Sequence, residues 1–286
     1  MIIGISRNSK YSPNHLQNDA AIFSIVSDFL KDAGYEIHLY TEDEFVEKRI
    51  DGDIFFSMAR SQATLRRLKT LEDKGALVIN SPYGISNCIR QPMTELLINN
   101  HIPYPDSIIS PVASLDISRL SYPCWIKRGD SHTIVKNDVC FASSPKIAED
   151  ILSDFKKRQI SSAVVNKHLY GDLIKFYGVS GTGFFHWFYP SMSLPSKFGL
   201  EIINGEAKGI AFDERELKSL CDRTSNILNV PVYGGDCIIQ NDGSIMIIDF
   251  NDWPSFARYR KEAGRNIASY ICRQAKEFTE KKKKTA

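Results

Sequence analysis

The first 82 residues alternate short apolar runs with amphipathic segments, and this alternation limits the possible folds more than any other feature of the chain. The helical spacing of apolar residues is clearest between Ile22 and Leu30. Strands that alternate with helices predict a parallel sheet covered by helices, as in α/β proteins. We expect strands at 2–6, 35–40, 53–58 and 76–80, and helices at about 19–33, 42–49 and 61–74.

Two arginines follow strands of this predicted sheet. Arg7 comes directly after the first strand and Arg60 comes shortly after the third. Ligands of open α/β sheets bind beyond the carboxyl ends of the strands, so we predict that both arginines bind an anionic part of a substrate. The alternative is that each is an ordinary surface arginine. No dinucleotide-binding fingerprint and no Walker-type phosphate loop is present, so neither site is predicted.

Residues 234–251 have the pattern of a β-hairpin. An Asp-Gly dipeptide, Asp242-Gly243, lies between two apolar runs and favours a two-residue turn. With that turn, Ile238 would lie opposite Ile247 and Asp236 would lie opposite Asp249. The open end of the hairpin would then carry two facing carboxylates.

This end of the hairpin is a candidate metal site. Asn251 lies two residues beyond Asp249 and therefore projects from the same face of the strand. Facing carboxylates repel each other, and a bound cation would relieve the repulsion. Carboxylate and amide oxygens suit a hard ion, so we predict that Asp236, Asp249 and Asn251 bind Mg²⁺. The alternative is that the two aspartates are simply hydrated at frayed strand ends, because a register slip of one residue separates them.

Composition narrows the class of protein. The chain has 286 residues, 43% of them hydrophobic and 24% charged, which predicts two or three globular subdomains. A net charge of +2 and one basic run, Lys281–Lys284, give no support for a nucleic-acid partner. The six cysteines are scattered and are expected to pack as free thiols. We see neither a signal peptide nor a long apolar stretch, and expect a cytoplasmic protein without membrane contact.

The rest of the chain predicts two further α+β units. A short helix at 92–100 leads into Ile102-Pro103-Tyr104-Pro105, a rigid connector typical of a boundary. We expect domains at 1–91, 92–169 and 170–286. The middle unit has predicted strands at 122–127, 138–142 and 162–166 and a helix at 144–159; the last has strands at 173–179, 183–188, 199–203 and 206–210, a helix at 214–228, the hairpin and a final helix at 261–280.

Four segments carry a resemblance to a known superfamily. They are the passage from Asn80-Ser81-Pro82 to the Ile102–Pro105 connector, the strand Tyr122–Lys127, the segment Val164–Lys175, and Asp236 together with Ile248–Pro254. In this order they resemble the ATP-grasp superfamily over nearly the whole chain, in particular its RimK-like and glutathione-synthetase-like ligases. The resemblance implies an α/β ATP-grasp fold, with an N-terminal Rossmann-like pre-ATP-grasp domain, a small α+β lid subdomain and a C-terminal α+β subdomain.

The resemblance also implies roles for single residues. Lys127 and Lys175 match the family's phosphate-binding lysines, and Asp236, Asp249 and Asn251 match its Mg²⁺ ligands. Asn166, Lys167, His168 and Leu169 match the hinge that binds the adenine of ATP. The implied reaction is an ATP-dependent carboxylate–amine or carboxylate–thiol ligation through an acyl phosphate, with small-molecule carboxylate and amine substrates and with Mg-ATP between the two ATP-grasp subdomains.

The chain departs from the family in two places. The loop after Lys127 lacks the usual run of glycines, and Asn166-Lys167 replaces an acidic residue of the hinge. Ser131-His132 resembles the inositol trisphosphate kinase branch, so His132 is a candidate catalytic residue, as is Arg258 near the acceptor; the alternative is that both are solvated. A small-molecule kinase and a nucleotide-binding module without turnover therefore remain alternatives to the ligase. The acceptor and the oligomeric state are not predicted.

Overall fold

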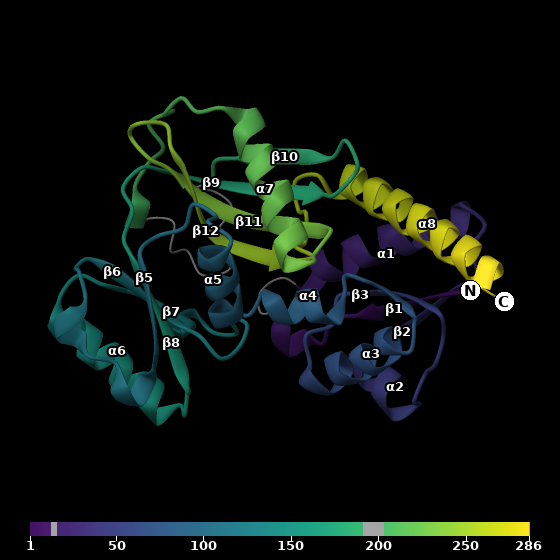
Figure 1. Cartoon of the computed structure of the whole chain (residues 1–286), viewed down its shortest axis with the longest axis horizontal. Helices are drawn as coiled ribbons and strands as arrows, with labels where there is room; N and C mark the ends of the chain where they lie inside the picture. Colours follow the sequence, from purple (N-terminus) through teal and green to yellow (C-terminus); the bar gives the residue numbers. More distant parts are fainter. Residues whose placement is uncertain (13–15, 191–202, 286) are drawn as a thin grey trace.

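The computed structural model describes residues 1–12, 16–190 and 203–285, which form three four-stranded sheets (Figure 1). The N-terminal sheet has the strand order β2-β1-β3-β4, and the pairs in it are parallel. Its strands are β1 (Ile2–Ser6), β2 (Ile37–Thr41), β3 (Ile54–Ser57) and β4 (Leu77–Ile79). The helices of this part are α1 (Leu16–Asp32), α2 (Glu42–Glu47), α3 (Gln62–Asp73), α4 (Pro82–Asn87) and α5 (Arg90–Asn99). The parallel sheet predicted from the sequence is confirmed.

The middle part is a small antiparallel sheet, which we call the lid sheet, with the order β5-β8-β6-β7. Its strands are β5 (Ser107–Pro111), β6 (Cys124–Arg128), β7 (Val139–Ala142) and β8 (Ser162–Lys167), and helix α6 (Pro145–Lys157) packs on one face. Strand β5 was not predicted from the sequence. Because Ile126 and Val165 face α6, the alternate residues Trp125, Lys127 and Asn166 lie on the opposite face.

The C-terminal sheet has the order β10-β9-β11-β12 and is antiparallel throughout. It contains β9 (Asp172–Val179), β10 (Phe185–Phe188), β11 (Val232–Ile239) and β12 (Ile245–Asp252), with helices α7 (Glu214–Leu228) and α8 (Arg260–Thr285). Short 3₁₀ helices lie at η1 (Ser9–Tyr11), η2 (Val112–Ser114), η3 (Ile117–Arg119) and η4 (Lys136–Asp138). No helix in the described part of the chain is long and apolar enough to cross a membrane.

The strand predicted at 206–210 is wrong, since this segment has no strand. The amides of Lys208 and Ile210 donate to the buried Asp172 carboxylate over 2.7 and 2.8 Å, so a side chain takes the place of a partner strand. The strand predicted at 199–203 lies outside the described residues except for Ile203, which is in a short helical turn. The domain boundaries at 91 and 169 stay predictions.

The C-terminal helix joins the first and last parts of the chain. Helix α8 packs along α1, and Ile267 and Ile271 share a buried cluster with Ile22 and Val26 (Figure 1). Near its end, the Nζ of Lys282 lies 2.7 Å from an Asp53 carboxylate oxygen. The N-terminal sheet therefore has its core completed by the last helix of the chain.

The hairpin turn between β11 and β12 differs from the prediction. Ile238 lies opposite Met246, not Ile247. The Gln240 amide donates to the Ser244 carbonyl over 2.9 Å and encloses a three-residue loop whose last residue is a glycine at φ 83°. This is the turn with a glycine bulge that three-residue hairpin loops favour, and it replaces the predicted two-residue turn.

A second irregularity restores the predicted pairing of the carboxylates. Cys237 lies opposite Ile247, the register then shifts, and Asp236 lies opposite Asp249. Ile248 is the extra residue of this β-bulge, and its carbonyl accepts hydrogen bonds instead from side chains outside the sheet. The facing aspartates are therefore confirmed, although by a different route from the one expected.

Gly84 in α4 lies against the end of α7. A Cβ atom at Gly84 would be 2.0 Å from the carbonyl oxygen of Asn229 and 2.7 Å from its carbonyl carbon. We therefore expect Gly84→Ala to lower the free energy of unfolding by about 1–3 kcal/mol, because backbone has to move. Urea unfolding measures the effect. Gly183→Ala is the control, since no atom lies within 4 Å of its Cβ position; an equal loss in both variants would contradict the packing.

Candidate active site

A cavity of about 480 Å³ lies between the lid sheet, the C-terminal sheet and the carboxyl ends of the N-terminal strands. Every predicted site residue except His168 lines it. The lid sheet and its hinge provide Lys127, Asn166, Lys167 and Leu169; the C-terminal sheet provides Lys175, Asp236, Asp249 and Asn251; other parts provide Arg7, Arg60, His132 and Arg258. One concave site thus collects residues that lie up to 251 positions apart in the sequence, from Arg7 to Arg258.

The side chain of His168 is not part of this lining. Its ring packs edge-to-face on Tyr170, and its Nδ1 accepts a hydrogen bond from Trp125 Nε1 over 3.1 Å. Burial lowers the pKa of His168. The assignment of His168 to the hinge stays a prediction, although its ring does not line the cavity.

The open end of the hairpin brings carboxylates and cations together. Lys175 Nζ lies 3.1 Å from Asp236 Oδ1, and Arg90 Nη1 lies 2.8 Å from Asp249 Oδ1. Asn251 donates its amide to Asp249 Oδ2 over 3.1 Å. Arg90, the first residue of α5, was missed from the sequence, because no local pattern tells which distant carboxylate an arginine meets.

These oxygen atoms fit a hard divalent cation. Asp236 and Asp249 face each other, Asn251 adds an amide oxygen, and all three line the cavity. The described residues contain no group of three or more His, Cys, Asp or Glu side chains that would suit a metal, so the fit rests on two carboxylates and one amide oxygen. The donor set therefore matches Mg²⁺, which needs only one or two carboxylates when phosphates supply further ligands.

Asp249 is ionised in this setting. Burial by itself would raise the pKa of Asp249, but the positive charges of Arg90 and Lys127 outweigh it and lower the pKa to about 2. The carboxylate is thus negatively charged at neutral pH and is available to a cation. The nearby Arg90 has its pKa raised, since the attraction of Asp249 outweighs the effect of burial.

Lys127 is buried beneath the cavity surface, with 7% of its area exposed. Burial and the charge of Arg90 lower its pKa to about 7, while Asp249 and Asp236 act in the opposite direction. Its Nζ donates to the carbonyl of the bulge residue Ile248 over 3.3 Å. An anion entering the cavity would favour the charged form of this lysine.

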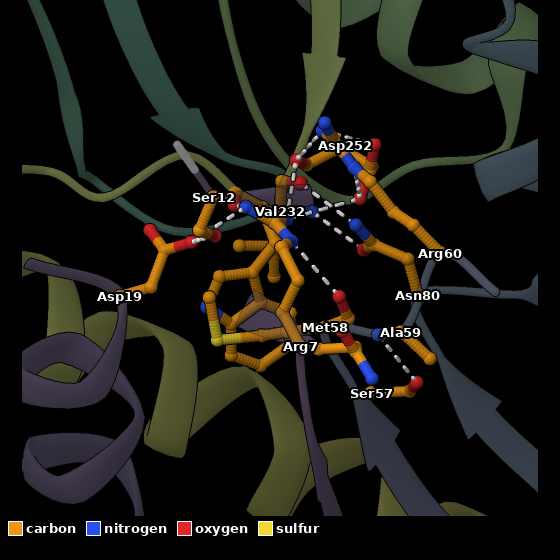
Figure 2. Close-up of polar contacts among 12 residues, drawn as sticks. Arg7, Ser12, Asp19, Ser57, Met58, Ala59, Arg60, Asn80, Val232 and Asp252 are labelled. Carbon is orange, nitrogen blue, oxygen red and sulfur yellow. Dashed lines mark hydrogen bonds and ion pairs between the residues drawn. The ribbon is translucent and has the colours of Figure 1, made fainter. Parts of the chain in front are cut away.

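The predicted anion-binding arginines make internal ion pairs (Figure 2). Arg60 Nη2 lies 2.8 Å from Asp252 Oδ1, and Arg7 lies 3.4 Å from the same carboxylate and 3.0 Å from Asp19. Asp252 is fully buried, and its pKa is lowered because Arg60 and Arg7 outweigh the effect of burial. Both arginines also line the cavity, and their substrate role stays a prediction. Asp252 was missed, although it directly follows Asn251.

Asn80 joins the N-terminal part to the C-terminal sheet. Its side chain donates to the Val232 carbonyl over 2.8 Å and accepts from the Val232 amide over 3.0 Å (Figure 2). This pair of bonds satisfies both backbone groups at the start of β11, so the side chain acts as a short partner strand. Together with the Asp252 ion pairs it fixes the sheet that carries the candidate metal ligands.

His132 and Arg258 occupy other parts of the lining. His132 is 7% exposed, and within the described chain its Nε2 has no hydrogen-bond partner. Burial and the charge of Arg60 lower its pKa to about 3, so the ring is neutral at physiological pH. The guanidinium of Arg258 lies 4.5 Å from the ring centre of Phe188. His132 is therefore buried and not solvated, contrary to the simpler of its two interpretations.

Similarity to known proteins is found at the level of the three-dimensional structure and not of the sequence. No protein-family model matches the sequence. No curated protein matches it either. Among solved structures, the D-alanine–D-alanine ligase from Bacillus anthracis complexed with ATP is similar, with a TM-score of 0.71 and 15% identity over 98% of this chain and 99% of that one.

Two further solved structures are similar to the chain over nearly its whole length. The ATP-grasp ligase PsnB complexed with a minimal precursor, Mg and ADP has a TM-score of 0.61 and 14% identity, over 96% of this chain and 98% of PsnB. The RimK domain ATP-grasp protein from Sphaerobacter thermophilus has a TM-score of 0.65 and 14% identity, over 95% of this chain and 100% of that one. The chain therefore has the ATP-grasp fold along nearly its whole length, which confirms the predicted fold.

Proposed function

We propose that the chain is an ATP-dependent ligase that activates a carboxylate as an acyl phosphate and transfers the acyl group to an amine or thiol. The observation that carries this proposal is the set of cations around two facing carboxylates, with Lys127, Lys175 and Arg90 beside Asp236 and Asp249. Two of the structural neighbours are named as ligases, and one of these two holds Mg and ADP. Fold alone does not determine chemistry, so the residues of the site must support the assignment.

The residues of the site would have two roles, metal binding and phosphate binding. Asp236, Asp249 and Asn251 would hold Mg²⁺, which when bound neutralises phosphate charge during transfer. Lys127 and Lys175 would contact the phosphates and stabilise the negative charge of the leaving ADP. No covalent protein nucleophile is needed, because positioning and electrostatic stabilisation supply the rate in such reactions.

The acceptor end of the cavity lies toward the N-terminal part of the chain. We place the carboxylate substrate near Arg258, whose guanidinium lines the cavity. Arg7 and Arg60 would contribute positive potential there, although Asp252 and Asp19 offset much of their charge. The lid sheet covers the nucleotide, and water is thereby kept from the acyl phosphate.

One observation favours a second candidate, a small-molecule kinase. His132 is buried in the same cavity. Its pKa is lowered by burial and by the positive charges of Arg60, Arg7 and Arg90. A kinase needs such donors around the transferred phosphoryl group and a hydroxyl acceptor. The same nucleotide site would serve both reactions, so the products must distinguish them.

Product stoichiometry tests the proposed function. The protein is incubated with Mg-ATP and pooled amino acids and small carboxylates, and ADP and free phosphate are measured together. A ligase releases phosphate in step with ADP, and only when two pooled components are present. ADP without free phosphate would assign the kinase, and no ADP with any pool would contradict both reactions for these substrates.

The lowered pKa of Lys127 gives a pH prediction. In the free protein its pKa is about 7, so at about pH 8 the amine is largely neutral. Bound phosphate raises the pKa of Lys127, so we expect Mg-ATP binding to take up a proton and the affinity to fall as the pH rises above about 7. Calorimetry in buffers of different ionisation enthalpy measures the uptake. Lys127→Met should abolish it, Lys136→Met on the exposed surface should not, and buffer-independent heats in the wild type would contradict the assignment.

A further inference from the structure

Glu42 is a buried acidic residue that does not line the cavity. It is the first residue of α2, and 1% of its area is exposed. Its Oε1 accepts from the amides of Asn8 and Arg60 over 2.9 and 3.2 Å, and its Oε2 accepts from the amide of Ser61 over 2.7 Å. Backbone N–H groups that converge in this way form the kind of concavity that binds anions.

The three amides belong to the loops that follow β1 and β3. These strands are neighbours in the order β2-β1-β3-β4, and the chain leaves them in opposite directions along the sheet, from β1 to β2 and from β3 to β4. Open α/β sheets bind their ligands at such a point, beyond the carboxyl ends of the strands. Here the carboxylate of Glu42 occupies that position, so the N-terminal sheet holds an anion that belongs to the chain itself.

The loops that Glu42 holds carry the two arginines that bind Asp252. Arg7 lies one residue before the first of the three amides, and the second amide is that of Arg60 itself. Arg60 Nη2 lies 2.8 Å from Asp252 Oδ1, and Arg7 Nη2 lies 3.4 Å from Asp252 Oδ2 (Figure 2). Asp252 directly follows the candidate metal ligand Asn251. A short chain of contacts therefore leads from Glu42 to the end of β12 that carries the candidate metal ligands.

We propose that Glu42 is a positioning residue of the magnesium–nucleotide site. Its carboxylate is a built-in anion that fixes the loops after β1 and β3, and the arginines of these loops then hold Asp252 and the neighbouring Asn251. This inference rests on the proposed function and adds to it a residue that touches neither the metal nor the nucleotide. Loss of a residue that orients metal ligands typically lowers metal affinity by about 10- to 100-fold.

The first test measures the affinity of the full chain for a non-hydrolysable ATP analogue, by calorimetry well below the melting temperature of every variant. Glu42→Ala should weaken binding in excess Mg²⁺ by about 10-fold, because the metal ligands lose their support. In EDTA the wild type and the variant should bind equally, since no metal then depends on those ligands. A merely structural role for Glu42 would not produce a loss confined to Mg²⁺.

Glu44→Ala is the matched control for this measurement. Glu44 lies two residues further along the same helix, and its exposed carboxylate bonds to Thr41 and Lys48 instead of the loops. This variant should leave the Mg²⁺-dependent affinity unchanged. Should Glu42→Ala fail to fold, Glu42→Gln takes its place, because it keeps one acceptor oxygen for the amides and should still show the loss in Mg²⁺.

Added acetate gives a second readout, which needs no nucleotide. Acetate consists of the carbon and the carboxylate that Glu42→Ala removes, so it fits the space left by the side chain and can accept from the three amides. We expect acetate to raise the melting temperature of Glu42→Ala by at least about 2 °C more than chloride at the same concentration. Glu42→Gln should show no such gain, because its side chain fills the space.

An unchanged Mg²⁺-dependent affinity in Glu42→Ala, beside normal binding in the wild type, would overturn the inference and leave the proposed function standing. Equal losses in Glu42→Ala and Glu44→Ala would also overturn it, because the effect would then belong to the helix as a whole. An acetate effect no larger than that of chloride would show that the loops do not bind an anion. If the wild type does not bind the analogue in Mg²⁺, the proposed function fails and the inference fails with it.

Discussion

Replacement of Asp249 by asparagine is expected to lower Mg-dependent kcat/KM by at least about 100-fold, comparable to the loss of one preorganised electrostatic contact in other enzymes. The substitution keeps the shape of the side chain and removes the charge that would attract the cation. It also leaves Arg90, 2.8 Å away, without its anionic partner. The measurement is the rate of ADP release at increasing Mg²⁺, once an acceptor has been found.

The control for this variant lies on the same hairpin. Asp242 is at the exposed turn, where its carboxylate accepts from the Ser244 amide over 3.0 Å, a bond that an asparagine oxygen also makes. Asp242→Asn should therefore leave turnover unchanged. Full Mg-dependent activity in Asp249→Asn would rule out this carboxylate as a metal ligand, whereas equal losses in both variants would point to damage of the hairpin.

Replacement of Asp252 by asparagine is expected to lower the free energy of unfolding by about 3–5 kcal/mol, the cost of breaking a buried ion pair by removing one partner. Asp252 is fully buried, and the side chains of Arg7 and Arg60 are only 6% and 8% exposed. Asparagine leaves Arg7 with the Asp19 carboxylate, 3.0 Å away, but takes from Arg60 the carboxylate that lies 2.8 Å from it (Figure 2). Urea unfolding at pH 7 measures the loss.

A control variant and the pH dependence of unfolding show whether the loss in Asp252→Asn comes from the buried ion pairs. Asp53→Asn breaks an exposed pair with Lys282, and should cost less than about 1 kcal/mol. The folded-state pKa of Asp252 is lowered, so its stabilisation is present above the unfolded pKa of about 3.9 and is lost as the pH falls through the folded value. The difference between wild type and variant should therefore shrink in acid. A loss no larger than that of Asp53→Asn would contradict the buried network.

Local patterns predicted most of the fold. The strand β1 at Ile2–Ser6 and the helix α7 at Glu214–Leu228 have the bounds expected from the sequence. Strand β5 was missed because Ser107–Pro111 has only a weak apolar pattern and forms by pairing with β8, which is distant in sequence. The strand predicted at 206–210 is absent because two amides of this segment donate to Asp172, a contact that no local pattern reveals.

The site was predictable where its residues lie in one strand and less so where it depends on long-range contacts. Asp249 and Asn251 follow from alternation in β12. The opposition of Asp249 to Asp236 was predicted with the wrong turn, and a bulge at Ile248 corrected the register. Arg90 and Asp252 were missed, because each is defined by a partner more than 150 positions away or by burial, and neither leaves a local signal.

Calorimetry with a non-hydrolysable ATP analogue measures whether this cavity binds a magnesium–nucleotide complex. The protein is titrated with the analogue in excess Mg²⁺ and again in EDTA, beside Asp249→Asn and Asp242→Asn. We predict saturable binding that weakens at least about 10-fold without Mg²⁺ and in Asp249→Asn, but not in Asp242→Asn. Absence of binding in Mg²⁺, or binding that neither EDTA nor Asp249→Asn alters, would show that the cavity is not a magnesium–nucleotide site.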